Sequence, residues 1–97
     1  MKKAEALRVL RRNRGKLREM GVRRLALFGS VVRDEASEAS DIDVLVELDA
    51  TAGYFQFLDI QDYLRETLAV SKVDLVLRNT LFEELREGIL REAVDVL

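Results

Sequence analysis

Three short aliphatic runs constrain the fold more than any other feature of the sequence. They cover residues 23–28, 42–48 and 72–77 and are rich in Leu, Val and Ile, which is typical of buried strands. Helical segments are expected over 3–20, around 31–35, over 52–69 and from 80 onward. The order α-β-α-β-α-β-α predicts an α/β (α+β) fold with a small three-stranded mixed sheet. Because three strands cannot cover both faces of their own sheet, we expect helices on one face and a working surface on the other.

The first and last helices carry further signals. Asn13 and Gly15 weaken the middle of the first helix and can break it into two pieces. The last helix is predicted to open at a capping box formed by Thr80 and Glu83. Its predicted buried side consists of four aliphatic residues: Leu81, Leu85, Ile89 and Val96.

The composition limits both the location and the chemistry. The 97 residues suffice for one domain, placed at 1–97. No apolar run approaches the ~20 residues that span a bilayer, and the first fifteen residues are too charged for a signal peptide. We therefore expect a cytoplasmic protein without membrane contact. There is no Cys and no His, which excludes zinc sites of the Cys/His type, disulfides, cysteine nucleophiles and Ser-His-Asp triads.

Two consequences follow for any site. A metal must be held by oxygen ligands, which favours Mg²⁺, Mn²⁺ or Ca²⁺, and a general base must be a carboxylate, a lysine or a tyrosine. The charge is also uneven: residues 1–24 carry a balance of +8 and residues 25–97 one of −10. This split indicates a basic surface for phosphate, nucleic acid or an acidic partner, or else a solvated helix face.

A glycine-serine corner and an arginine follow the first strand. Gly29 and Ser30 come directly after Phe28, where backbone N–H groups and a hydroxyl can meet a phosphate. Gly29 allows close approach of a ligand. Arg33 lies four residues past Gly29 and could reach the same phosphates; a plain surface residue is the alternative. The sequence has neither a P-loop nor a G-x-G-x-x-G fingerprint.

Carboxylates occupy two later strands. Asp41 and Asp43 project to one face of the second strand while Ile42 goes to the core. Their mutual repulsion can be relieved by a divalent cation; a polar turn beginning at Ser40 is the alternative. Asp74 interrupts the apolar third strand and can join the face that carries Asp43. Its alternative role is that of an edge charge which discourages aggregation.

These residues together resemble the nucleotidyltransferase superfamily that includes DNA polymerase beta. The resemblance is strongest to its stand-alone minimal nucleotidyltransferases and covers nearly the whole chain, including the segments 22–28 and 89–94. It rests on seven residues at matching spacings: Gly29, Ser30, Arg33, Ser40, Asp41, Asp43 and Asp74. One position departs from the family pattern. Many relatives have Gly after the motif arginine, whereas this chain has Asp34, an acid that would weaken phosphate binding.

The resemblance implies roles for these residues. Asp41, Asp43 and Asp74 would be the catalytic carboxylates holding two Mg²⁺ ions, with Mn²⁺ as a substitute. The nucleotide, ATP or another nucleoside triphosphate, would be held by four residues: Gly29, Ser30, Arg33 and Ser40. The reaction would move a nucleoside monophosphate, AMP in the first instance, to a hydroxyl of a protein. The resemblance implies a small helical HEPN-domain toxin as partner, with this chain as the antitoxin.

Alternatives remain at this point. The chain could silence its partner by contact alone, or the basic residues 2–24 could bind nucleic acid; the lack of an aromatic residue there argues against nucleic acid. Apolar residues on the acidic face need a cover, from a partner, a neighbouring helix or a second copy in a homo-oligomer. Five residues are candidates for that interface: Ala26, Leu45, Val76, Phe55 and Tyr63.

Overall fold

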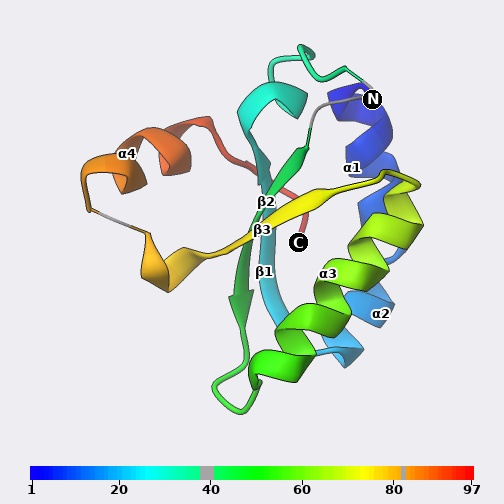
Figure 1. Cartoon of the computed structure of the whole chain (residues 1–97), viewed down its shortest axis with the longest axis vertical. Coiled ribbons are helices and arrows are strands. Elements are labelled where there is room, and N and C mark those ends of the chain that lie inside the picture. Colours follow the sequence, from blue (N-terminus) through cyan, green and yellow to red (C-terminus); the bar gives the residue numbers. More distant parts are fainter. Residues whose placement is uncertain (38–40, 82) are drawn as a thin grey trace.

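The computed structural model describes residues 1–37, 41–81 and 83–97 (Figure 1). Ser40, predicted to bind nucleotide, lies outside the described residues. The elements follow in the order α1 Lys3–Arg12, α2 Arg14–Glu19, β1 Val22–Phe28, η1 Gly29–Val31, β2 Ile42–Leu48, α3 Tyr54–Leu68, β3 Val73–Leu77, η2 Arg78–Thr80, α4 Glu83–Glu92 and β4 Val94–Asp95. No helix within these ranges is both long enough and apolar enough to cross a membrane.

The sheet is mixed, as predicted, and its strands run in the order β3-β2-β1-β4. Strands β2 and β3 pair in parallel, while β1 pairs antiparallel with both β2 and β4. The α+β class is therefore confirmed, but the described residues form four strands rather than the predicted three. Strand β4 is only two residues long, too short for any periodic pattern in the sequence to reveal it. Beyond it, the Val96 N–H donates to the Leu25 carbonyl at 2.8 Å, so Val96 is buried as an extension of the sheet and not as part of a helix.

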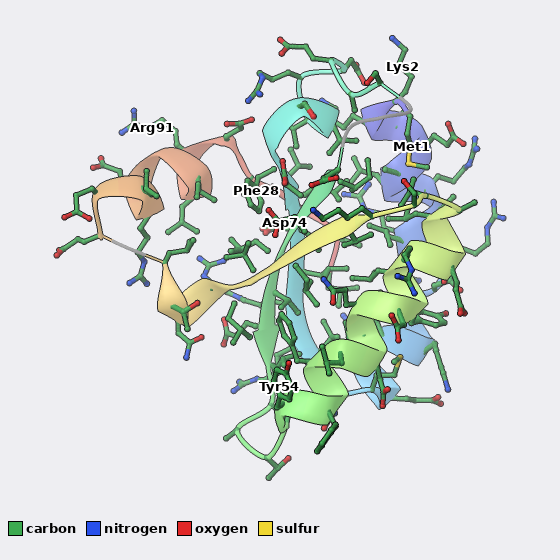
Figure 2. The ribbon with its side chains drawn as sticks, viewed as in Figure 1. Met1, Lys2, Phe28, Tyr54, Asp74 and Arg91 are labelled. Carbon is green, nitrogen blue, oxygen red and sulfur yellow. The ribbon has the colours of Figure 1, made fainter. Side chains whose placement is uncertain are left out.

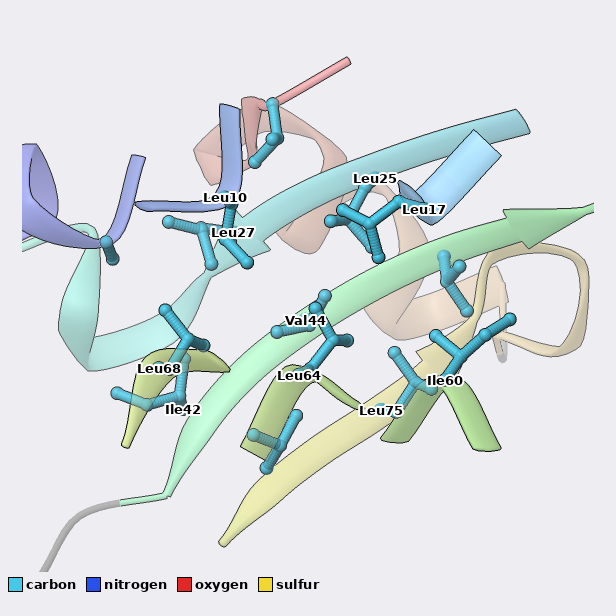
Figure 3. Packing of buried hydrophobic residues seen from close by; sticks show 14 of the residues in the cluster. Leu10, Leu17, Leu25, Leu27, Ile42, Val44, Ile60, Leu64, Leu68 and Leu75 are labelled. Atoms are coloured by element: carbon cyan, nitrogen blue, oxygen red, sulfur yellow. The ribbon is translucent and has the colours of Figure 1, made fainter. Parts of the chain in front are cut away.

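The hydrophobic core lies between the sheet and the helices α1, α2 and α3 (Figure 3). Alternate residues of each strand point into it, among them Leu25, Leu27, Ile42, Val44, Val46, Val73 and Leu75. Figure 1 shows these three helices on one side of the sheet and α4 on the other. Helices α1–α3 thus cover one face, as expected, and leave the opposite face to α4 and the predicted site.

The break between α1 and α2 falls at Asn13, as the sequence suggested. The Asn13 amide donates to the Val9 carbonyl at 2.7 Å, and its side-chain oxygen accepts the Tyr63 hydroxyl at 2.8 Å. Tyr63 also packs against the core. Its hydroxyl therefore joins α3 to the break between the first two helices, and these helices supply part of its cover, which was the alternative to an interface with a partner.

Helix α4 differs most from the prediction. It contains no buried residue among those described, and Leu85 is 59% exposed. The capping box is not formed, since the Thr80 hydroxyl donates back to the Leu77 carbonyl at 3.0 Å and the helix begins three residues later. The apolar residues of this segment do recur at helical spacing, but the described residues of α4 are not buried against the rest of the chain. Helix α4 is therefore a weakly anchored element beside the site face.

Candidate active site

Strand register brings the two central aspartates together. Asp43 on β2 is the direct partner of Asp74 on β3, and Phe28 at the end of β1 is the partner of Asp43 on the other side. Their strand neighbours Ile42 and Val73 are buried in the core, so Asp43 and Asp74 project from the opposite face. Figure 2 shows Asp74 near the middle of the molecule, close to Phe28 in this view. Asp41 comes one residue before β2 and is partly exposed.

Gly29 is required by two independent features. Its φ angle is +76°, in the left-handed region that side chains disfavour. A Cβ atom at this position would lie 3.0 Å from Cγ of Asp43 and closer still to its Oδ2. The backbone of the corner therefore touches the carboxylate directly. The helix predicted around 31–35 is instead a single 3₁₀ turn, Gly29–Val31, so phosphate binding here would rely on individual N–H groups rather than on a helix dipole.

Asp43 is the electrostatic centre of this cluster. Partial burial raises the pKa of Asp43, and the neighbouring carboxylates of Asp74, Asp41 and Glu92 raise it further, while Arg33 lowers it. Ionised Asp43 is therefore disfavoured first by its partial removal from water and then by repulsion from the neighbouring carboxylates. A divalent cation would remove that repulsion.

The acidic side chains are suitable ligands for a divalent cation, but those described are not already arranged around one common point. In the described parts of the chain, no three acidic side chains lie close enough to form a ready cation site. The Asp41 carboxylate instead pairs with Lys72, with 3.5 Å between Oδ2 and Nζ. The oxygen donors fit the preference of Mg²⁺ and Mn²⁺, and the direct pairing of Asp43 with Asp74 fits a shared ion. A cation that binds Asp41 would replace this exposed ion pair with Lys72.

The pKa of Asp43 leads to a prediction about stability. Because the folded chain holds the Asp43 proton more tightly than the unfolded chain, ionised Asp43 lowers the free energy of unfolding at neutral pH. This destabilisation disappears as pH falls through the raised pKa. We expect Asp43→Asn to melt at a higher temperature than the wild type at pH 7 without divalent cations, and the gap to narrow towards pH 4. Melting curves across this range check it; a gap that widens on acidification would contradict the raised pKa.

Asp34, the position that departs from the family pattern, contacts the start of helix α1. Its φ angle is +56°, which explains why glycine suits this position. Its Oδ1 accepts the backbone N–H of Lys3 at 2.7 Å, so the acid satisfies a free donor at the start of α1 and complements the positive end of that helix. The expected interference with phosphate is therefore not supported by its contacts.

Substitutions at Asp34 should separate these two features. Asp34→Ala removes the hydrogen bond and keeps a Cβ at positive φ, so it should lower the free energy of unfolding by about 1 kcal/mol. Asp34→Gly loses the same hydrogen bond but removes the backbone strain at positive φ. Its free energy of unfolding should therefore be close to that of the wild type. Urea unfolding of both variants measures the difference. If the free energy of unfolding fell equally in the two variants, the positive φ angle of residue 34 would have no effect on stability.

A sizeable cavity lies away from these residues. Its volume is about 770 Å³. It opens where β2 and β3 end and α3 begins, and its lining includes Glu47, Tyr54, Phe57, Arg78 and Arg86. Asp43, at the opposite end of β2, is not part of it. This cavity, which the sequence did not reveal, is therefore separate from the aspartate cluster.

The apolar residues on the face of the sheet that carries Asp43 and Asp74 are less exposed than the sequence suggested. Ala26 and Leu45 are paired across β1 and β2 and are already buried within the chain, at 3% and 2% exposure. Val76 is half-buried. Phe55 is the member of the predicted interface that remains open, at 79% exposure, and it packs edge-to-face against Tyr54.

Comparisons with known proteins identify the family and the fold of the chain. The family described as "Nucleotidyltransferase domain" matches residues 10–96. The chain is 38% identical to the protein adenylyltransferase MntA of Thermococcus cleftensis over 91% of this chain and 89% of that protein. It is also similar to a solved structure assigned as a minimal nucleotidyltransferase, with a TM-score of 0.83, 36% identity and coverage of 97% and 95% of the two chains.

A more distant structural likeness extends to a toxin-antitoxin complex. The complex contains a tri-AMPylated Shewanella oneidensis HEPN toxin and an MNT antitoxin, and the match has a TM-score of 0.65 at 20% identity over 94% of this chain and 71% of that one. At this identity the likeness concerns the fold alone. The family match and the relatives above 30% identity are decisive: the chain belongs to the nucleotidyltransferase domain family, resembles its minimal members in size and fold, and is a nucleotidyltransferase.

Proposed function

We propose that this chain transfers AMP from ATP to a hydroxyl group of a protein partner, as the antitoxin of a HEPN/MNT pair acting in the cytoplasm. The observation that carries the proposal is the direct pairing of Asp43 with Asp74 beside the Gly29 corner. It puts acidic ligands and a close backbone approach at one spot. The name of the Thermococcus relative supports the adenylyl group and a protein acceptor.

The proposed reaction assigns a task to each group. Asp41, Asp43 and Asp74 would hold Mg²⁺, two ions in our proposal, or Mn²⁺ in its place. The metal, when bound, neutralises charge on the triphosphate and lowers the pKa of the acceptor hydroxyl. Asp74 is exposed and can take the hydroxyl proton directly or through water. The acceptor oxygen then bonds to the α-phosphorus, the bond from phosphorus to the bridging oxygen breaks, and pyrophosphate leaves.

Phosphate binding falls to the corner after β1. Gly29 leaves room for the triphosphate against the backbone, and the Ser30 hydroxyl and the N–H groups of the 3₁₀ turn are donors of suitable type. Arg33 supplies the positive charge. Ser40 keeps its proposed place in the nucleotide site on sequence grounds.

The partner proposal rests on relatives and on exposed surface. Similar folds have been solved as a toxin-antitoxin complex with AMP-PNP and as an MNT antitoxin with a HEPN toxin. In this chain the aromatic pair Tyr54 and Phe55 and the Leu85 side chain are exposed. These apolar groups offer surface to a helical partner.

A labelling experiment tests the function. The purified chain is incubated with ATP labelled at the α-phosphate, Mg²⁺ and the helical protein encoded beside it, and transfer is followed on gels. We expect label on the partner, none without divalent metal, and a rise in melting temperature when Mg²⁺ and ATP are added together. A stable complex without label would favour silencing by contact alone. Oligonucleotide binding that falls steeply with salt and ignores loss of Asp43 would favour the nucleic-acid alternative.

A further inference from the structure

Arg33 is held by carboxylates on two of its three nitrogens. Its Nε donates to Oε2 of Glu35 at 3.2 Å, and its Nη1 donates to Oε1 of Glu92. Both ion pairs raise the pKa of Arg33. Nη2 makes no hydrogen bond within the part of the chain that the structure describes. The side chain is about half exposed, so a ligand can approach it from solvent.

Glu92 reaches Arg33 from a distant part of the sequence. It is the last residue of α4 and stands just before β4, whose Val94 pairs with Leu27 of β1. This pairing fixes the end of α4 beside the strand that leads to Gly29. The Glu92 side chain is less exposed than that of Glu35, at 32% against 63%. Glu92 is therefore the better anchored of the two carboxylates that hold Arg33.

Both members of the pair lie close to the aspartate cluster. Glu92 raises and Arg33 lowers the pKa of Asp43, which places the ion pair within electrostatic reach of the metal ligands. A guanidinium held at two of its nitrogens has a defined plane, so the directions of its remaining N–H groups are fixed. In metal sites, groups that orient a ligating side chain in this way commonly contribute ten- to hundredfold to affinity or activity, and we expect an effect of the same order for an oriented arginine.

From this geometry we propose that Glu92 is a positioning residue: it holds Arg33 so that Nη2 faces the terminal phosphates of the bound nucleotide. The inference rests on the proposed role of Arg33 in nucleotide binding. It assigns the end of α4 a place in substrate recognition. Neither the spacing of the sequence motif nor the aspartate cluster indicates such a role.

Nucleotide titration of matched variants tests the proposal. Mg²⁺–ATP binding is measured by calorimetry, and KM and kcat are measured with the partner. Glu92→Ala should weaken ATP binding about tenfold and raise KM for ATP, with kcat changed far less. Glu92→Gln should retain most of the affinity, because its amide oxygen can accept the same N–H group. Glu87→Ala is the control, since Glu87 lies on the same helix and pairs only with Arg91 in the described structure; it should leave binding unchanged.

The Arg33→Ala background separates this inference from the proposed function. There, adding Glu92→Ala should cause little further loss, because Glu92 acts through Arg33. If adding Glu92→Ala to Arg33→Ala lowered ATP affinity by a further tenfold, Glu92 would have a merely structural role and the inference would be overturned. Tighter binding of ATP by Glu92→Ala would overturn it too, since Glu92 would then compete with phosphate. If Arg33→Ala itself binds ATP normally, the assignment of Arg33 in the proposed function fails together with the inference.

Discussion

Replacing Asp43 with Asn is expected to remove AMP transfer while leaving the fold intact. Asp43 is the partner of Asp74 in the sheet and is in contact range of Gly29, so it would be the ligand shared by metal and nucleotide. Asn has nearly the same shape but lacks the charge that binds a divalent cation. A loss of about 4 kcal/mol of transition-state stabilisation corresponds to roughly a thousandfold lower kcat/KM. Transfer of labelled AMP to the partner, followed over time, measures the effect.

The matched control for this variant is Asp59→Asn. Asp59 is exposed on α3, on the far side of the sheet from the cluster. This substitution makes the same chemical change and should leave transfer and melting temperature nearly unchanged. Should Asp43→Asn retain wild-type transfer, the assignment of the active site to this cluster would be wrong.

The second large effect is expected at Gly29. Gly29→Ala places a Cβ against the Asp43 carboxylate and forces a side chain to adopt a φ angle of +76°. The backbone strain should lower the free energy of unfolding by about 1–2 kcal/mol. The displaced carboxylate should also lower kcat/KM by roughly a hundredfold or more, because small misplacements of reacting groups have effects of this size. Urea unfolding and the transfer assay measure the two effects separately.

Gly88 provides the control for the glycine substitution. It lies inside α4, and nothing stands within 4 Å of a Cβ built there. Gly88→Ala should raise the free energy of unfolding by about 0.5–1 kcal/mol through helix propensity, with little change in transfer. If both variants were equally active and equally stable, the close packing of Gly29 against Asp43 would have no functional meaning.

Local sequence patterns predicted the elements that pack one face against the hydrophobic core. Strand β2 has the predicted bounds, Ile42–Leu48, because a β-branched run between polar residues is a strong strand signal. The break at Asn13 was predicted for a similar local reason. Helix α4 was predicted as a helix, but its burial was not predicted correctly, because apolar spacing shows that a helix has an apolar side and not whether anything covers that side. Strand β4 depends wholly on its partner β1 and has no pattern of its own.

In the candidate site, too, local patterns predicted some features, while others depend on contacts between distant residues. Alternation along β2 and β3 predicted that Asp43 and Asp74 share a face. Their direct pairing could not be derived, because strand register depends on tertiary contacts. The contact of Glu92 with Arg33 joins residues 59 positions apart, and no local pattern links them. The contact of Asp34 with Lys3 joins residues 31 positions apart and was likewise not predictable from local sequence.

The central claim is that Asp41, Asp43 and Asp74 hold divalent cations against a triphosphate at the Gly29 corner. Crystals grown with Mn²⁺ and a non-hydrolysable ATP analogue would test it through the anomalous signal of manganese. The account predicts a manganese peak between the carboxylates of Asp43 and Asp74, with the terminal phosphates near Gly29 and Arg33. Nucleotide bound instead in the cavity lined by Arg78 and Arg86, with no manganese at Asp43, would contradict it.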